Sequence, residues 1–308
     1  MLEAFDEARL AASSPDDLSD ALERGAIVYF PRAPIPLPSD DDLVFFREEL
    51  PKLLTLKNIS YHAEAGRVRG LDRADAKLAD RVNRVLVSVS NNVEAFLKTS
   101  APRLTDGWTV GTCSFRPIEE HGRKLKAHAS NELVHIDAGA YGATNGDRIL
   151  RFFVNVNPKE DRVWATKGDF PNLYRRYADK AGIHPDSAGP RYLRRGPLDQ
   201  LRTGLLTGLA SVGLPAAKVL DSSPYDRVMR KFHNYMKDTP SFQQDKAGHQ
   251  EFRFPPYSAW MVFTDMVSHA SLSGQFAFVH TGIVRLQNCR LPDLAPINIL
   301  RTSAGRPA

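Results

Sequence analysis

Residues 133–139 are Leu133-Val134-His135-Ile136-Asp137-Ala138-Gly139, a short apolar run that carries a histidine and an aspartate two positions apart. Side chains at positions i and i+2 of a strand point to the same face, so His135 and Asp137 can reach one ion if this run is a strand. Gly139 marks the expected end of that strand. A third ligand must come from a neighbouring segment, and we expect it to be His269, which follows the apolar run Trp260-Met261-Val262-Phe263. Two histidines and one carboxylate form the facial triad of non-haem Fe(II) oxygenases, which leaves three coordination positions open for a co-substrate and O2.

The short motif is weak by itself, because the composition predicts about one His-x-Asp/Glu by chance. The chain has four, and the others begin at His62, His184 and His249. His62 lies in an irregular polar stretch, and Pro185 within the motif that begins at His184 indicates a loop. The His249 motif follows Gly248 just before an expected strand and is the closest rival. A hydrogen-bonded histidine inside a barrel is the alternative for His135.

The other histidines need the same comparison. A histidine in a turn is usually solvated, so His269 has that alternative, and His280 on the next expected strand competes with it. The remaining histidines have polar, loop-like or helix-face contexts for which solvent exposure is the default, namely His121, His128, His184, His233 and His249.

Composition sets broad limits. A chain of 308 residues that is 42% hydrophobic can bury a large core, and barrels often use such a length in one domain. Only Cys113 and Cys289 are present, which argues against a disulfide scaffold or a cysteine-ligated metal and suits a reducing compartment. The first residues have no basic and apolar leader, so we expect no signal peptide. The longest mainly apolar stretch, residues 205–220, is interrupted by polar residues and falls short of the roughly 20 apolar residues of a membrane span.

Periodicity predicts helices at both ends of a β-rich middle. The first 25 residues, 41–56 and 78–97 have helical patterns, and Val82, Val85, Leu86 and Val89 begin a core-facing stripe. Strands are expected at residues 25–30, 108–115, 133–137, 149–156, 252–254, 259–263 and 276–286. Residues 168–248 are expected to be a helical insertion, with one helix beginning at Ser223-Pro224. We therefore predict a single α+β domain over residues 1–308, with a double-stranded β-helix (a jelly roll, cupin-like) buttressed by helices.

An oxygenase that uses 2-oxoglutarate must also bind the far carboxylate of that co-substrate, and the planar fork of arginine suits it. In the expected strand over residues 149–156, alternation places Arg151, Phe153 and Asn155 on one face and Arg148 on the other. Burying an arginine without an anion is costly, so Arg151 meets either a ligand or a protein carboxylate, and we favour the ligand. Arg116 is the second candidate. Arg285 is a third, and we expect it at the barrel rim.

Motifs spread along the chain give it a wider resemblance. They are carried by residues 57–60, 66–70, 114–117, 122–123, 133–138, 146–151, 155–158, 254–265 and, most specifically, His269-Ala270-Ser271-Leu272-Ser273-Gly274-Gln275-Phe276. With them the chain resembles the 3-deoxy-D-manno-oct-2-ulosonic acid (Kdo) hydroxylases, Fe(II)- and 2-oxoglutarate-dependent dioxygenases of the bacterial lipopolysaccharide inner core. The resemblance implies that His135, Asp137 and His269 bind Fe(II). It also implies Arg116, Arg151 and Gln275 near the carboxylates of 2-oxoglutarate, with O2 as the oxidant and 3-hydroxylation of Kdo as the reaction.

The chain departs from the family pattern in three places. Residues 126–132 replace a run of basic and acidic residues, Gly139 stands where an aromatic is usual, and residues 279–282 replace Glu-Gln-Thr-Phe. All three flank the metal motif, so they bear on the acceptor more than on the reaction type.

Two classes of function remain to be compared. The first is the hydroxylase, acting on Kdo or on another small-molecule or sugar acceptor. The second is a non-catalytic glycolipid-binding module on the same barrel, against which the intact triad argues. Net charge +5 suits anionic partners. We find no basic stripe interleaved with aromatic residues in the sequence, so we do not expect nucleic-acid binding.

The sequence also suggests where the protein works. We expect a cytoplasmic protein, and peripheral attachment to the inner membrane is a further hypothesis. It rests on Arg191, Arg194, Arg195 and Arg202 beside a leucine face formed by Leu201, Leu205, Leu206 and Leu209. Packing of these leucines against the barrel is the alternative.

Overall fold

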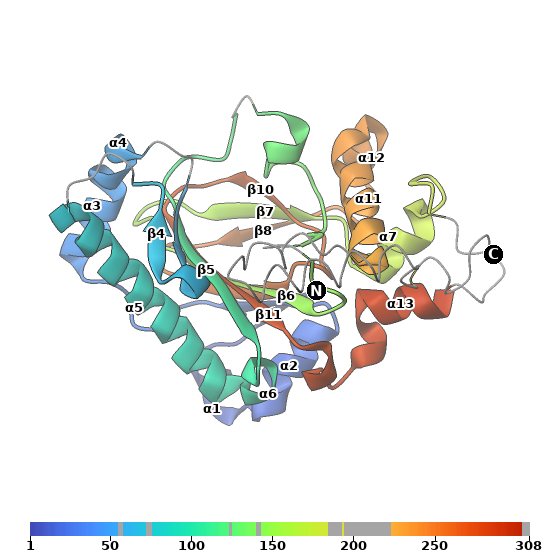
Figure 1. Ribbon diagram of the computed structural model, residues 1–308, viewed down its shortest axis with the longest axis horizontal. Coiled ribbons are helices and arrows are strands. Elements are labelled where there is room, and N and C mark those ends of the chain that lie inside the picture. Colours follow the sequence, from blue (N-terminus) through green and yellow to red (C-terminus); the bar gives the residue numbers. More distant parts are fainter. Residues whose placement is uncertain are drawn as a thin grey trace, which may run out of the picture.

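The computed structural model describes residues 1–54, 58–71, 76–122, 125–139, 143–183, 193 and 223–303. They form a mixed α+β fold in which helices surround two β-sheets (Figure 1). The strands are β1 (Leu2–Ala4), β2 (Ile27–Phe30), β3 (Ile59–His62), β4 (Arg67–Arg69), β5 (Thr109–Arg116), β6 (Arg148–Asn155), β7 (Arg162–Thr166), β8 (Gln250–Phe254), β9 (Ala259–Phe263), β10 (Ala270–Ser273) and β11 (Ala277–Val284). The helices are α1 (Glu7–Ala12), α2 (Pro15–Glu23), α3 (Asp40–Glu48), α4 (Leu50–Leu53), α5 (Ala76–Ser100), α6 (Pro102–Thr105), α7 (Phe170–Tyr177), α11 (Pro224–Asp238), α12 (Pro240–Gln244) and α13 (Pro296–Ser303).

The large sheet has eight strands in the order β1-β2-β9-β6-β11-β5-β3-β4, and the small sheet has three in the order β10-β7-β8. All neighbouring pairs are antiparallel except β1 and β2. The centre of the large sheet is its most regular part, since β11 pairs with β6 along the whole of both strands. The small sheet lies over this centre in Figure 1.

Helix α5 covers the face of the large sheet that points away from the small sheet. Its apolar residues recur at helical spacing, and the predicted stripe of Val82, Val85, Leu86 and Val89 is buried. Phe96 of α5 meets the ring of Phe152 on β6 at a centroid distance of 5.8 Å. Because side chains alternate along a strand, Arg151 and Phe153 must point to the opposite face, toward the small sheet.

Local sequence signals explain where two helices begin. In α2 the backbone nitrogen of Ser14 donates to the side chain of Asp17, and in α11 that of Ser223 donates to Asp226. Both helices have proline in their first turn, and α11 was expected to begin at Ser223-Pro224.

The expected strands at 25–30, 108–115, 149–156, 252–254, 259–263 and 276–286 are confirmed within a few residues, and the described parts of 168–248 up to β8 are helical. The strand expected at 133–137 is wrong: this segment forms only a bridge between His135 and His269. The irregular structure expected at His62 is also wrong, because His62 ends β3. Strands β1, β3, β4, β7 and β10 were not predicted.

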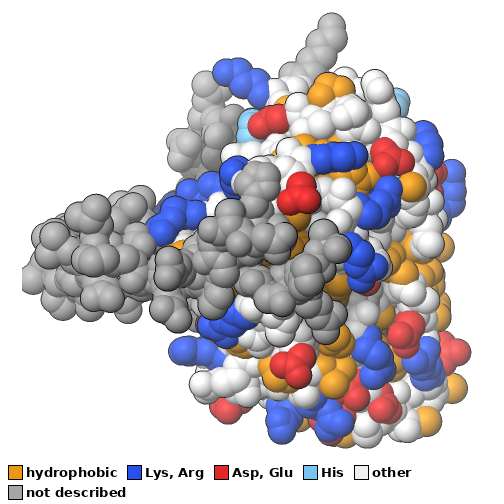
Figure 2. All heavy atoms as spheres, turned by 90° about the vertical axis from the view of Figure 1, so that its right-hand side faces the viewer, with side chains coloured by type: hydrophobic (Ala, Val, Ile, Leu, Met, Phe, Trp, Pro, Cys, Tyr) orange, Lys and Arg blue, Asp and Glu red, His pale blue; other side chains and the backbone are white. Residues whose placement is uncertain are grey.

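The surface on the side of α7 and α11 mixes basic and acidic side chains over its described part (Figure 2). None of the described helices has the length and hydrophobicity needed to cross a membrane. The arginines and leucines of the membrane hypothesis, at 191, 194, 195, 201, 202, 205, 206 and 209, lie outside the described residues.

Candidate metal centre

A backbone bridge brings two distant histidines together. The nitrogen of His135 donates to the carbonyl of His269 at 3.0 Å, and the nitrogen of His269 donates to the carbonyl of His135 at 2.8 Å. Two positions further, the nitrogen of Asp137 donates to the carbonyl of Thr264, just after β9, at 2.8 Å. His135 and Asp137 therefore keep the i, i+2 relationship of a strand, although the segment is not part of a sheet.

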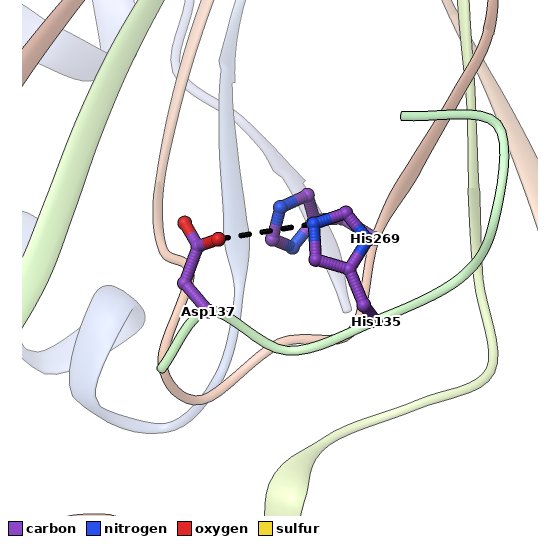
Figure 3. Close-up of side chains that lie close together, drawn as sticks. All are labelled: His135, Asp137 and His269. Carbon is purple, nitrogen blue, oxygen red and sulfur yellow. Dashed lines mark ion pairs between the residues drawn. The ribbon is translucent and has the colours of Figure 1, made fainter. Parts of the chain in front are cut away.

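The side chains of His135, Asp137 and His269 converge (Figure 3). One potential ligand atom from each lies within 4.8 Å of the others, and Nε2 of His135 is 3.8 Å from Oδ1 of Asp137. All three residues are buried. Within the described part of the chain, this is the one cluster of histidine, cysteine and acidic side chains with a geometry suited to a metal ion.

Hydrogen bonds fix which histidine nitrogens face the centre of this cluster. Nδ1 of His135 lies 2.7 Å from the carbonyl of Leu133, and Nδ1 of His269 lies 3.1 Å from the carbonyl of Val267. A carbonyl can only accept, so Nδ1 must carry the proton in both rings. Each Nε2 then has a lone pair for a metal, which is the tautomer that a carbonyl partner selects in metal sites.

The electrostatics suit a divalent cation. Burial lowers the pKa of His135 and of His269, so both imidazoles are neutral near pH 7. Burial alone would raise the pKa of Asp137, but the Arg151 guanidinium, the two histidines and the Thr264 hydroxyl together hold it below its usual range. Two neutral imidazoles and one ionised carboxylate fit Fe(II) in the facial-triad arrangement.

A cavity lies in front of the triad, between the two sheets. The large sheet contributes Arg116, Arg151, Phe153 and Val279, and the small sheet contributes Arg162, Trp164 and Ser271. Asn58 and Asn131 complete its lining together with the triad.

Three arginines and two carboxylates set the charge of this cavity. Nη2 of Arg151 is 2.9 Å from Oδ2 of Asp137. Nη2 of Arg162 is 3.1 Å from Oε1 of Glu120, and Nη1 of Arg116 is 4.0 Å from the same oxygen. Of the carboxylates only that of Asp137 lines the cavity, so the three guanidinium groups leave an excess positive charge in its lining, which a divalent cation would increase. The cavity is therefore suited to anionic ligands.

The small sheet also offers hydrogen-bond donors that the protein does not use. Nε of Arg162, Nε1 of Trp164 and Oγ of Ser271 are buried and have no hydrogen-bond partner. Trp164 and Ser271 are register partners on β7 and β10, and Arg162 lies two positions before Trp164 on the same face. Buried donors are normally paired, so their presence in a cavity indicates a ligand with oxygen acceptors.

The structure separates the predicted residues into two groups. Arg116 and Arg151 line the cavity with the triad, whereas Gln275 lies between β10 and β11 and is not among the lining residues. Arg285 is exposed and donates to the carbonyl of Gly107, away from the cavity, as expected for a rim position. Arg148 is on the opposite face of β6 from Arg151 and is paired in the core with Asp265 at 2.6 Å.

The competing histidines lie elsewhere. His249 pairs with Glu251 at 3.3 Å at the surface, and His280 is buried beside Trp108 on the face of β11 that points away from the cavity. The exposure expected for His233 is wrong: it is largely covered, and its ring meets that of His135 edge-on at 5.1 Å.

The cavity contains residues that the sequence did not reveal. Arg162, Trp164 and Ser271 were missed because β7 and β10 were not predicted as strands. The β-branched and aromatic residues within Arg162-Val163-Trp164-Ala165-Thr166 were the available signal.

Comparisons with known proteins agree with this geometry. The family model described as 3-deoxy-D-manno-oct-2-ulosonic acid (Kdo) hydroxylase matches residues 6–307. The chain belongs to the Kdo hydroxylase family. The resemblance stated from the sequence is thereby confirmed. No match was found among the curated proteins.

Solved structures show the same likeness. The crystal structure of the Kdo hydroxylase KdoO, a non-haem Fe(II) α-ketoglutarate-dependent dioxygenase, with α-ketoglutarate and Fe(III) is 26% identical to the chain, with a TM-score of 0.79. The alignment covers 99% of this chain and 96% of that one. The cobalt(II) complex of KdoO gives a TM-score of 0.80 at 26% identity, with the same coverage. The family and fold thus extend over essentially the whole chain.

Proposed function

We propose that this Kdo hydroxylase family member is an Fe(II)- and 2-oxoglutarate-dependent dioxygenase that hydroxylates a Kdo-type sugar of the lipopolysaccharide inner core at its 3-position. The observation that carries the proposal is the convergence of His135, Asp137 and His269 in a cavity lined by three arginines. We also assign the two sheets that enclose the cavity to a double-stranded β-helix within a single domain.

His135 and His269 would bind iron through Nε2, and Asp137 through a carboxylate oxygen. Bound there, the metal supplies O2 activation coupled to oxidative decarboxylation of 2-oxoglutarate to succinate. The protein holds the ligands in their binding form. Carbonyl oxygens keep the proton on Nδ1 of each histidine, and Arg151 keeps the carboxyl group of Asp137 ionised.

The arginines would neutralise the carboxylates of the co-substrate. Arg151 contacts the triad directly, and Arg116 lies further along the cavity, so these two are the proposed anchors, with Arg162 as a third cation. The proposed role of Gln275 has less support, since Gln275 does not line the cavity.

The walls of the cavity would exclude water from the reaction. The ring of Trp164 stacks on His269 at 5.3 Å with 21° between the planes, and Phe153 packs edge-on against Trp164 at 4.7 Å. An apolar wall beside the metal limits access of solvent to the reacting groups. The hydrogen-bond donors of the cavity that the bound co-substrate does not use would suit an acidic sugar such as Kdo.

The identity of the acceptor is the most specific part of the proposal. The departures at residues 126–132, Gly139 and 279–282 flank the triad, so another sugar or small-molecule acceptor is the alternative within the same chemistry. Purified protein should be incubated with Fe(II), 2-oxoglutarate, O2 and Kdo-bearing lipid A. We expect succinate, and a product heavier by one oxygen atom in the Kdo unit. Succinate without a Kdo product would indicate another acceptor, and absence of both would indicate a non-catalytic binding module.

The cellular location of the protein is proposed from its sequence alone. We propose a cytoplasmic enzyme attached peripherally to the inner membrane through Arg191, Arg194, Arg195 and Arg202. Each basic residue near an anionic bilayer contributes about 1 kcal/mol, so four are enough to matter at low salt. Co-sedimentation with anionic vesicles at low and high salt tests this. The attachment hypothesis fails if the protein does not pellet at low salt, or if replacing the four arginines with glutamine changes nothing.

A further inference from the structure

The segment that carries His135 and Asp137 behaves as a strand with one strand neighbour missing. Its odd-numbered residues face β10 and the end of β9: His135 exchanges two backbone hydrogen bonds with His269, and Asp137 donates to Thr264. In a strand the intervening residues direct their backbone groups to the other side. Val134 and Ile136 therefore need partners on the side where helices α11 and α12 lie.

Gln243 of α12 supplies the partner for Val134. Its Oε1 accepts from the nitrogen of Val134 at 3.0 Å, and its Nε2 donates to the carbonyl of the same residue at 2.9 Å. Nε2 also donates to the carbonyl of Met236 near the end of α11, at 2.8 Å. Two carbonyls and one N–H fix the orientation of the amide, because only the nitrogen can donate. The side chain thus makes the pair of bonds that a neighbouring strand would make.

His233 of α11 supplies the partner for Ile136. Its Nδ1 lies 2.7 Å from the carbonyl of Ile136, so this nitrogen donates, and its ring edge meets the ring of His135 at a centroid distance of 5.1 Å. Together, Gln243 and His233 hold the peptide group that immediately precedes His135 and the one that immediately precedes Asp137. Figure 1 shows α11 and α12 beside the end of the small sheet.

We propose that Gln243 and His233 are positioning residues of the metal centre, and that α11 and α12 replace the missing strand and aim the side chains of His135 and Asp137. The inference rests on the proposed function in that it takes the triad to be the metal site. The physical reason is that a small rotation of the peptide at Val134 or Ile136 would turn a ligand away from the metal. Loss of a group that orients a ligand typically weakens metal binding by about 10- to 100-fold.

The test uses Co(II), which does not require turnover, as a probe of the site. Gln243→Leu keeps the approximate size of the side chain but removes both hydrogen bonds to Val134, and Gln244→Leu on the exposed neighbour is the matched control. We expect the Gln243→Leu protein to bind Co(II) about 10- to 100-fold more weakly. We also expect an altered Co(II) absorption spectrum and more succinate released per hydroxylated acceptor. The control should match the unaltered protein in all three measurements.

A second pair of variants tests the inference if Gln243→Leu does not fold. His233→Gln retains an N–H that can reach the carbonyl of Ile136, whereas His233→Leu does not. We expect weakened Co(II) binding in His233→Leu and substantial recovery in His233→Gln.

Three results would contradict the inference. Unchanged Co(II) affinity and spectrum in a folded Gln243→Leu protein, with only a lower melting temperature, would mean that Gln243 is merely structural. An equal loss of Co(II) affinity in both His233 variants would show that the hydrogen bond from His233 does not position the metal centre. Failure of the unaltered protein to bind Co(II) would overturn the proposed function as well.

Discussion

The guanidinium group of Arg151 forms an ion pair with the carboxylate of Asp137, with 2.9 Å between Nη2 and Oδ2. Arg151 lies on β6 and Asp137 on the segment that is bridged to His269, so the pair joins the large sheet to the metal centre. The sequence left two partners open for Arg151, a ligand or a protein carboxylate. The structure shows the carboxylate of Asp137 as one partner, and contact with 2-oxoglutarate stays a prediction.

Replacement of Arg151 by alanine should raise the KM for 2-oxoglutarate steeply. Leaving a buried carboxylate without its charged partner costs roughly 3–5 kcal/mol, so an increase of about a hundredfold or more is expected. Steady-state kinetics measured as succinate release would check this. Arg285→Ala, at the exposed rim, is the control and should leave KM unchanged. A large effect in Arg116→Ala or Arg162→Ala with none in Arg151→Ala would assign the anchor to another arginine.

His135→Ala should abolish turnover and leave the protein folded. The bridge to His269 uses backbone atoms that alanine also has, whereas one of three metal ligands is lost. Co(II) at about 100 times its dissociation constant should stabilise the unaltered protein by about 2.7 kcal/mol, and should have little effect on the variant. Thermal melts with and without Co(II) measure this difference. His249→Ala, which alters the rival motif at the surface, should behave like the unaltered protein. Near-native succinate production by His135→Ala would remove this residue from the site.

The regular strands could be predicted because their signals are local. Residues 149–156 and 259–263 are nearly continuous apolar runs, and alternation correctly placed Arg151 opposite Phe152. The triad could be selected from among the histidines and His-x-Asp/Glu motifs of the chain because its two segments lie next to apolar runs. These signals depend only on neighbours in the sequence.

The remaining features depend on long-range partners. Residues 133–137 are not a strand because side chains of α11 and α12 take the place of a neighbouring strand. Strand β7 begins with a buried arginine, which is tolerated because Glu120 lies 3.1 Å away. Helical periodicity could not tell that the face carrying His233 lies against His135. No pattern among neighbouring residues predicts these contacts between residues that are distant in the sequence.

Gly274→Ala should weaken 2-oxoglutarate binding through Arg162. Gly274 has φ +114°, which an alanine rarely adopts, and an added Cβ would lie 3.0 Å from both Cα and Cγ of Arg162. The carbonyl of Gly274 also accepts a hydrogen bond from Nη1 of Arg162. We expect lower thermal stability and a higher KM for 2-oxoglutarate. Gly66→Ala is the control, since it has positive φ but open space around it. Equal stability losses with no change in KM for either variant would show that Arg162 does not hold the co-substrate.

His280→Leu should make stability less dependent on pH. Burial lowers the pKa of His280 from 6.5 to about 4, and Nε2 has no hydrogen-bond partner. Between these two values the unfolded chain binds a proton that the folded protein does not, so stability falls as pH falls from 6.5 toward 4. A difference of 6.5 minus about 4 corresponds to about 3 kcal/mol at 1.36 kcal/mol per pKa unit.

Urea unfolding of metal-free protein at a series of pH values would measure this contribution. The curve for His280→Leu should lose about 3 kcal/mol less than that of the unaltered protein on going from pH 7 to pH 4. The other buried histidines titrate in both proteins, so the difference between the two curves isolates His280. His121→Leu, at an exposed position, should keep the full dependence. Parallel curves for His280→Leu and the unaltered protein would mean that His280 gains a proton in the folded state as readily as in the unfolded chain, for example through water reaching Nε2 beside Trp108.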